Sequence, residues 1–402
     1  MSNSPHPPRI LMMAYTYYES DPRVIREAEA AVEAGFEVEF LALSRAGAPK
    51  VETLNGVLVT RLNQAKHRGS GRIKYLRAYS EFFFRCLIKA AALSMRNAYS
   101  VVHVNNMPDF LVFSALVPKL RGAKVILDIH DPMPNTFVSK FKGQDGSLPY
   151  RVLLWQERLS AAFCDQVITV HDPVKHGILE KHGLAASSIA VVANFPDENV
   201  FPVQPAPVFD GTVRLIFHGT ILERSGLRTL IEGVAGARHK DKVAVRIIGE
   251  GDFSGALREM VERLELTHIV EFDNHSYPVR EIPERIRDCN LGIVPLTMSS
   301  ITNYALPLKL LEYISMGLPV MSIRNSAICY YLNEEDCIFF DADRPASLSA
   351  ALDRVIESPE ILQRQRARSL ALRKRFSWTP EKAKYINLVQ KLAGIQVEVP
   401  VH

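Results

Sequence analysis

Residues 301–320, ITNYALPLKLLEYISMGLPV, place a lysine and a glutamate at the start of an expected helix. Lys309 falls in the first turn after a proline, and Glu312 follows one turn later. A helix start presents unpaired N–H groups and the positive end of the helix dipole, which suits a diphosphate, and Lys309 would add a mobile cation. The carboxylate of Glu312 can accept hydrogen bonds from two ribose hydroxyls. The alternative from this segment alone is an ordinary amphipathic helix with a solvated lysine and glutamate.

Glycines follow two expected strands further upstream. Residues 218–227, HGTILERSGL, begin at a strand end, where Gly219 would let phosphates approach the backbone closely. Arg224 in the same loop has a planar guanidinium that can bind a phosphate at two points. The alternative is a plain strand-to-helix turn with a surface arginine. A Gly-Glu-Gly turn with Glu250 and Gly251 follows the next strand, and such glycines commonly only make a tight turn.

Polar residues also follow a strand in the first half of the chain. His130 and Asp131 come directly after the expected strand at residues 124–128, and a doubly wound domain exposes functional groups at this end of its strands. The histidine could equally cap the following turn. Near the start of the chain, Arg23 and Arg26 lie on an expected helix and are candidates to contact an acceptor phosphate.

The elements that must position these residues alternate regularly. Strands are expected at residues 9–14, 37–43, 101–104, 124–128, 166–170, 214–218, 244–248, 269–272, 291–295 and 319–323, with helical segments between most of them. This alternation is typical of α/β proteins with a parallel sheet covered on both faces. A chain of 402 residues is long enough for two such domains, and three prolines at residues 201–211 mark the boundary. We expect two Rossmann-like doubly wound domains, residues 1–205 and 206–378, that face a central cleft.

The composition describes a soluble globular protein, with 47% hydrophobic residues, 23% charged residues and a net charge of +4. This small net charge argues against a nucleic-acid-binding protein. The five cysteines lack the spacing of metal ligands, so we expect reduced thiols. Neither a signal peptide nor an apolar run of about 18 residues is evident. The composition therefore favours a cytoplasmic protein.

The donor segment resembles that of a known family. Glu312, Tyr313, Gly317, Pro319 and Val320 match the E-A/Y-x-x-x-G-x-P-V motif of the retaining glycosyltransferases of GT-B fold, the family 4-like, group 1 enzymes. The segment is similar to a subgroup with a P-x-K-x-x-E-Y motif. Many members build bacterial polysaccharides or glycolipids, and the resemblance covers nearly the whole chain.

The resemblance implies roles for the candidate residues. The first domain would bind the acceptor and the second the donor, and residues 379–402 would form a helix that crosses back to the first domain. The donor would be a nucleoside-diphosphate sugar, the acceptor a hydroxyl of a glycan or lipid-linked saccharide, and neither a metal nor another cofactor would be needed. The implied catalytic residues are His130, Arg224 and Lys309, the donor-binding residues Gly219, Thr220, Glu250, Gly251, Pro307, Leu308 and Glu312, and the acceptor-binding residues Arg23, Arg26 and Asp131.

The chain departs from the family pattern at two positions. Tyr304 stands where members carry a glutamate that touches the donor sugar, and Ser225 stands where they carry a lysine. These departures leave two alternatives to a transferase open, namely an inactive sugar-nucleotide-binding or scaffold subunit and a sugar-nucleotide epimerase.

Residues 66–96 contain eight lysines or arginines and one acid, Glu81, among several aromatic residues. On a helix, Lys74, Arg85, Lys89 and Arg96 fall on one side and most of the aromatic residues on the adjoining side. One hypothesis is a helix that docks on an anionic membrane and brings the protein to the inner face of the plasma membrane. The alternative is a crossover helix that buries its aromatic side in the core.

Overall fold

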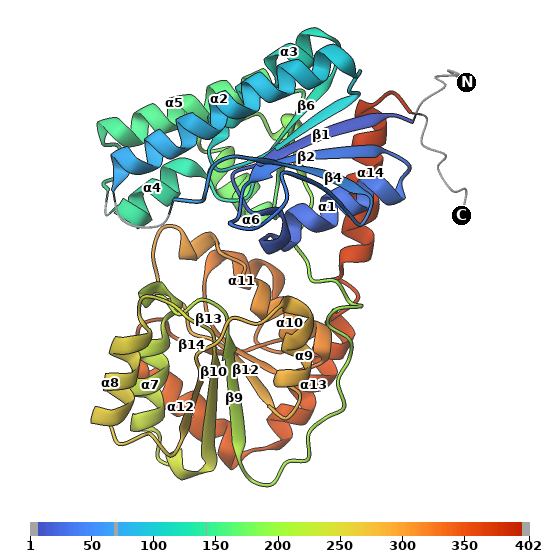
Figure 1. Ribbon diagram of the computed structural model, residues 1–402. Coiled ribbons are helices and arrows are strands. Elements are labelled where there is room, and N and C mark those ends of the chain that lie inside the picture. Colours follow the sequence, from blue (N-terminus) through green and yellow to red (C-terminus); the bar gives the residue numbers. More distant parts are fainter. Residues whose placement is uncertain (1–6, 68–70, 142, 396–402) are drawn as a thin grey trace. The chain divides into compact units, whose positions relative to one another are not determined.

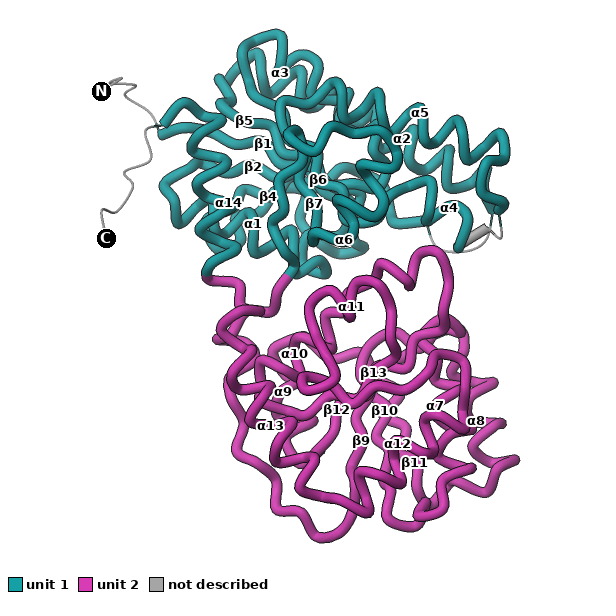
Figure 2. The backbone as a smooth tube through the Cα atoms, turned by 180° about the vertical axis from the view of Figure 1, so that it is seen from behind, with its two compact units in different colours: residues 1–194, 380–402 teal, residues 195–379 magenta. Residues whose placement is uncertain are grey.

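The computed structural model describes residues 7–67, 71–141 and 143–395, which form two compact units (Figures 1 and 2). Unit 1 contains residues 1–194 and 380–402, and unit 2 contains residues 195–379. The division therefore falls earlier than the expected boundary between residues 205 and 206. The reason is packing: the ring of Phe195 lies edge-on against that of Phe376, 5.3 Å between centroids, and the N–H of Gln204 donates to the carbonyl of Met316.

Unit 1 is built on an eight-stranded sheet in the order β3-β4-β2-β1-β5-β6-β7-β8. The strands are β1 (Arg9–Ala14), β2 (Glu37–Leu43), β3 (Val51–Leu54), β4 (Val57–Leu62), β5 (Val101–Asn105), β6 (Lys124–Ile129), β7 (Gln166–Thr169) and β8 (Ile189–Val191). All neighbours are parallel except β3 and β4. The strand expectations for this half are confirmed to within a few residues, whereas β3, β4 and β8 had not been expected.

Helices cover both faces of this sheet (Figure 1). They are α1 (Pro22–Glu33), α2 (Arg72–Arg96), α3 (Leu116–Leu120), α4 (Met133–Phe141), α5 (Leu148–Phe163), α6 (Asp172–Val174) and α14 (Trp378–Leu392), with a 3₁₀ helix η2 (Asp109–Ala115). Asp21 caps α1 by accepting the N–H of Val24, and Pro22 fits the first helical position, where no N–H is needed.

The last helix, α14, belongs largely to unit 1 although it follows unit 2 in the chain. The buried hydroxyl of Tyr385 lies 2.9 Å from Nδ1 of His103 on β5, and the carboxylate of Glu381 accepts the N–H of Ala193 at 2.7 Å. Of the residues 379–402 that were expected to return to the first domain, 380–395 are grouped with unit 1, and 396–402 lie outside the described residues.

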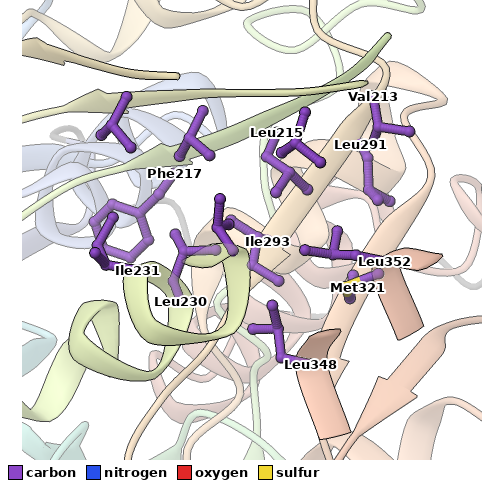
Figure 3. Close-up of a cluster of buried hydrophobic side chains, with 14 of the residues drawn as sticks. Val213, Leu215, Phe217, Leu230, Ile231, Leu291, Ile293, Met321, Leu348 and Leu352 are labelled. Atoms are coloured by element: carbon purple, nitrogen blue, oxygen red, sulfur yellow. The ribbon is translucent and has the colours of Figure 1, made fainter. Parts of the chain in front are cut away.

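Unit 2 is built on a six-stranded parallel sheet in the order β11-β10-β9-β12-β13-β14. The strands are β9 (Val213–His218), β10 (Val243–Ile248), β11 (Val270–Asp273), β12 (Leu291–Val294), β13 (Val320–Ile323) and β14 (Ile338–Phe340), and the helices are α7 (Leu227–Gly236), α8 (Ser254–Arg263), α9 (Ile282–Arg285), α10 (Leu308–Met316), α11 (Ser326–Tyr331), α12 (Pro345–Glu357) and α13 (Glu360–Leu372). The core between the sheet, α7 and α12 is mainly aliphatic, with Leu215, Leu230 and Leu352 fully buried (Figure 3). Both units therefore have the expected doubly wound α/β architecture.

Candidate functional site

In unit 2, the loops after β9 and β10 are held together backbone to backbone. Gly219 has φ +113° and donates its N–H to the carbonyl of Ile248 at 2.9 Å. Gly249 has φ +138°, and a Cβ atom there would lie 2.1 Å from the carbonyl oxygen of Gly219. Only glycine fits such a close approach at positive φ. The two glycines thus bring the Gly219 loop into one fixed position at the carboxyl end of the sheet.

Gly251 also takes part in the packing between the loops that follow β9 and β10. A Cβ atom at this position would lie 2.0 Å from the carbonyl oxygen of Ile221, whose N–H donates to the carbonyl of Glu250. Packing between the two loops therefore fully explains the glycine, and its expected contact with a donor remains a prediction.

The helix start at α10 lies against the Gly219 loop. Pro307 is the N-cap residue, and Leu308 and Lys309 form the first turn, ahead of the first intrahelical hydrogen bonds. The Nζ atom of Lys309 lies 3.6 Å from the centroid of the Phe217 ring, and a Cβ atom at Gly219 would lie 3.3 Å from that nitrogen. The cation and the helix start thus lie beside the exposed backbone of Gly219.

The ammonium group of Lys309 is largely withdrawn from water. Burial lowers the pKa of its ammonium group to about 7, although the carboxylate of Glu312 partly opposes this shift. A desolvated ammonium group gains from a new negative charge, because the charge compensates for the lost water. A bound anion would therefore raise this pKa again, and the anion site at Lys309 remains a prediction.

Glu312 is held one turn further along α10. One of its carboxylate oxygens lies 3.1 Å from Nε2 of His218, the last residue of β9, and the His218 ring stacks edge-on against Tyr313. The hydroxyl of Tyr313 in turn donates to the carbonyl of Ile216 on β9. His218 was not among the expected site residues, although its position at a strand end just before Gly219 was a usable signal.

In the loop between β9 and α7, the side chain of Ser225 is buried and that of Arg224 is exposed. The hydroxyl of Ser225 donates to the carbonyl of Thr220 and accepts the N–H of Leu222, so this buried side chain fixes the loop. Arg224 is exposed, and its guanidinium has no partner among the described residues. The side chains of Thr220 and Glu250 are exposed as well.

In unit 1, Asn106 fixes the loop after β6. Its side-chain oxygen accepts the N–H of His130 at 2.9 Å, and its amide group donates to the carbonyl of Asp131 and to the carboxylate of Asp109. His130 is partly exposed and Asp131 is exposed. Asn106 was missed because it lies at a neighbouring strand end, after β5, rather than in the loop that it holds.

Arg23 lies inside unit 1, which contradicts its expected role as an acceptor contact. Its guanidinium is 4% exposed and donates two hydrogen bonds to the carboxylate of Asp128 and one to the carbonyl of Val192. Its Nη2 atom also lies 3.1 Å from the carboxylate of Glu27. A buried guanidinium needs such partners, and each of the three nitrogen atoms of Arg23 has one inside unit 1. Arg26 contacts the side-chain oxygen of Asn194 within the same unit.

Asp128 orients the ring of His130. The Nε2 atom of His130 lies 2.9 Å from Oδ2 of Asp128 and 3.0 Å from Nε of Arg23. Because the Nε–H of Arg23 already donates to Asp128, the consistent arrangement has the Nε2–H of His130 donating to Asp128 as well. This tautomer leaves Nδ1 of His130 as a hydrogen-bond acceptor.

The buried carboxyl groups around Arg23 differ in charge. Burial would raise the pKa of Asp128, but Arg23 and His130 hold it well below its usual range, so Asp128 is ionised. Burial raises the pKa of Glu27 well above its usual range despite Arg23. Burial also lowers the pKa of His103. Glu27, His103 and Asp128 could form a metal ligand set, but the guanidinium of Arg23 already supplies the positive charge between the two carboxyl groups.

The fold is shared with solved structures of GT-B proteins. The sucrose-phosphate synthase of Thermosynechococcus elongatus is 17% identical, with a TM-score of 0.74 over 96% of this chain and 99% of that chain. HepE of Anabaena, solved with UDP, is 12% identical, with a TM-score of 0.70 over 96% of this chain and 100% of that chain. At these identities the likeness shows the fold, which is GT-B.

The two halves of the chain match two models of glycosyltransferase domains. Residues 21–194 match the glycosyl transferase 4-like domain, and residues 212–358 match the glycosyl transferases group 1 domain. The chain therefore belongs to the group 1 glycosyltransferases, a family of transferases. A protein of Escherichia coli K12 named "Putative colanic acid biosynthesis glycosyltransferase WcaL" is 26% identical over 154 residues. That match spans only 38% of this chain and 38% of the relative.

Proposed function

We propose that the protein transfers a sugar from a nucleoside-diphosphate sugar to a hydroxyl group of a glycan or lipid-linked acceptor, with retention of the anomeric configuration. The observation that carries this proposal is the group at the carboxyl end of the unit 2 sheet. There the α10 helix start, the Lys309 ammonium and the Glu312 carboxylate lie beside the exposed backbone of Gly219. An anion site and a carboxylate one helical turn apart suit the two halves of a nucleoside diphosphate.

Each residue of this group has a proposed part in donor binding. The first-turn N–H groups of α10, the ammonium of Lys309 and the exposed guanidinium of Arg224 would stabilise the negative charge of the departing diphosphate. Glu312 would accept hydrogen bonds from the ribose hydroxyls, with His218 limiting its rotation. We propose that these groups supply the positive charge for which other enzymes use a metal ion, so that no cofactor is needed.

In unit 1, we propose that His130 positions a hydroxyl group of the reacting sugars. The tautomer set by Asp128 makes Nδ1 an acceptor for such a hydroxyl. Asp131 remains a candidate acceptor contact because its side chain is exposed, whereas Arg23 is not.

The described cysteines support a cytoplasmic site of action. Cys86, Cys164, Cys289, Cys329 and Cys337 are all free thiols. Reduced thiols are usual in a reducing compartment. In the described parts of the chain, no helix combines the length and apolarity needed to cross a lipid bilayer.

The test is nucleotide binding followed by turnover. UDP, GDP and ADP are titrated by calorimetry, and the nucleotide that binds is then used in a panel of sugar donors read by mass spectrometry. We expect Glu312→Ala to weaken nucleotide binding about tenfold to hundredfold, because a charged acceptor of hydrogen bonds is lost. Glu262→Ala, which removes an exposed glutamate of α8, is the matched control. Equal nucleotide affinities for the wild-type protein and Glu312→Ala would contradict the assignment of Glu312 to a nucleotide-binding site.

One observation favours an inactive nucleotide-binding subunit as the second candidate. Tyr304 replaces the usual sugar-binding glutamate, and it lies in the short 3₁₀ helix η8 (Thr302–Tyr304) just before α10. Nucleotide binding without turnover of any donor would support that candidate, and donor conversion without an acceptor would support an epimerase. Sugar transfer with the product anomer identified by NMR spectroscopy would support the retaining transferase.

A further inference from the structure

The solvent side of α2 carries a row of large apolar side chains. Ile73, Leu76, Phe84, Ile88 and Met95 are 58–83% exposed. At about 100° per residue, these five positions fall within a sector of about 120°, so they lie on one side of the helix, where Arg77 and Ser80 separate Leu76 from Phe84. Exposed apolar side chains gathered on one side of a helix indicate a surface that contacts a membrane or another protein.

This stripe is not the aromatic side of α2 that the sequence had singled out. Phe82, Cys86 and Ala90 on that side are fully buried, and Tyr79 packs edge-on against Tyr15 at 4.9 Å between ring centroids. The core-facing alternative is therefore correct for the aromatic side. The apolar residues left in solvent lie on another side of the same helix.

A second stripe runs along α5. Leu148, Val152, Trp155 and Leu159 are 40–75% exposed and recur every three or four residues. On a helix this spacing places all four on one side, within a sector of about 60°. The exposed Arg151 borders this stripe. An exposed tryptophan next to aliphatic residues is typical of helices that lie at a lipid–water interface.

The two stripes belong to one side of unit 1. The 3₁₀ helix η2 lies between the helices, since Phe110 packs against Phe83 of α2 and Phe113 packs against Phe163 of α5. Figure 1 shows α2, α3 and α5 together over the same face of the sheet. We call the solvent side of these helices the apolar face, and its members are Ile73, Leu76, Phe84, Ile88, Met95, Leu116, Leu120, Leu148, Val152, Trp155 and Leu159.

The exposed charge along α2 is mainly positive. Lys74 and Arg96 of α2 are exposed beside the stripe, Arg77 is exposed within it, and the single acid of α2, Glu81, already pairs with Arg85 at 2.8 Å. A second copy that covered this face with its own would bring like charges together. An anionic lipid surface instead offers negative charge to the cations and hydrocarbon to the apolar side chains.

We propose that the apolar face docks the protein on an anionic membrane surface, with the exposed residues of α2, α3 and α5 inserted at the lipid–water interface. Docking itself does not depend on the transferase activity. The consequence that unit 1 takes its acceptor from the membrane rests on the proposed function.

The test is flotation of the full-length protein with vesicles. We expect binding to vesicles of phosphatidylglycerol and phosphatidylcholine, much weaker binding to phosphatidylcholine alone, and weakening as salt is raised. The double variant Ile88→Ser, Trp155→Ser should bind at least about tenfold more weakly, because two exposed apolar side chains are lost. Lys74→Gln, Arg96→Gln should also lose about tenfold. All four residues are exposed, so the fold should tolerate these changes.

Matched controls lie on unit 2. Met298→Ser, Tyr330→Ser removes exposed apolar side chains there, and Arg263→Gln, Arg354→Gln removes exposed cations. Both controls should bind vesicles as the wild-type protein does. The proposal fails if anionic vesicles do not bind, if the variants of α2 and α5 bind unchanged, or if those variants instead dissolve a dimer seen by light scattering. Nucleotide affinity is measured on every variant as well. Vesicle binding then tests the docking proposal, and nucleotide binding independently tests the proposed function.

Discussion

The carboxylate of Asp128 connects the partly exposed ring of His130 to the interior of unit 1. Oδ2 of Asp128 lies 2.9 Å from Nε2 of His130 and 2.8 Å from Nη2 of Arg23, while Asp128 itself is fully buried. One carboxylate therefore both neutralises a buried guanidinium and fixes the tautomer of a histidine at a strand end. The two tasks can be separated experimentally.

We predict that Asp128→Asn lowers both stability and turnover. Leaving the charge of Arg23 without its main partner should cost about 3 kcal/mol of unfolding free energy, measured by urea denaturation. We expect kcat to fall with little change in the KM for the donor, because the ring of His130 loses its fixed orientation. His130→Ala should lower kcat similarly without the loss of stability, and the double variant should be no worse in kcat than either single variant.

Asp288→Asn is the control for Asp128→Asn. It breaks a more exposed ion pair with Arg246, so it should cost about 1 kcal/mol or less. An Asp128→Asn protein as stable as this control would contradict the buried pair, and additive losses of kcat would contradict the coupling to His130.

We predict that Glu27→Gln removes a pH dependence of stability. Burial raises the pKa of Glu27 in the folded protein, so the folded state holds this proton where the unfolded state has released it. The stabilisation is complete below the unfolded pKa of about 4.3 and is lost as pH rises toward the folded pKa. Unfolding free energies measured from pH 5 upward should therefore fall more steeply for the wild-type protein than for Glu27→Gln. Parallel curves for the two proteins would contradict this prediction.

We predict that nucleotide affinity falls above pH 7 because of Lys309. The pKa of its ammonium group is about 7 in the free protein, and a bound diphosphate would raise it. Below pH 7 the lysine is already charged, whereas above pH 7 binding must first take up a proton, which weakens affinity by up to about tenfold per pH unit. Calorimetry in buffers of different ionisation enthalpy measures this proton uptake directly.

Two variants control the Lys309 prediction. Lys309→Arg keeps the charge at all these pH values and should flatten the profile. Lys309→Met should weaken nucleotide binding and yet raise the melting temperature of the free protein, because a desolvated ammonium group is removed. A profile for Lys309→Arg as steep as that of the wild-type protein would assign the proton to another group.

We predict opposite effects for alanine at two glycines of unit 2. Gly219→Ala forces a side chain to φ +113° and toward the Nζ atom of Lys309, so it should cost about 1–2 kcal/mol of stability and weaken nucleotide binding. Gly255→Ala lies on α8, where a Cβ atom meets nothing within 4 Å, and should stabilise the protein by about 0.5–1 kcal/mol. Thermal melts and nucleotide titrations distinguish the two outcomes, and a stabilised Gly219→Ala would contradict the close approach.

Local patterns were sufficient to predict most of the fold. The buried runs that form β1, β6 and β9 were recognisable because parallel strands are apolar on both faces. The hairpin of β3 and β4 was missed because its short strands at the edge of the sheet lack such a run: no residue of β3 is fully buried. The unit boundary was also misplaced, since prolines mark irregular backbone and do not reveal on which core that backbone packs.

The candidate site was predictable where neighbours in sequence are neighbours in space. Lys309 and Glu312 lie one turn apart on α10, so their spacing was informative. Arg23 was misjudged because its partner Asp128 lies on β6, far away in the sequence, and nothing near Arg23 indicates that it turns inward. Asn106 and His218 were missed for the same reason, because each acts on a residue of another element.

The return of α14 to unit 1 determines the order in which the two units can be completed. Unit 2 occupies residues 195–379, so every residue that it needs has been synthesised before Glu381 and Tyr385 exist. Until then His103 lacks its partner Tyr385 in the interior of unit 1, and the N–H of Ala193 lacks the carboxylate of Glu381. On the ribosome, the half of the protein that is made second is therefore the first that can finish folding.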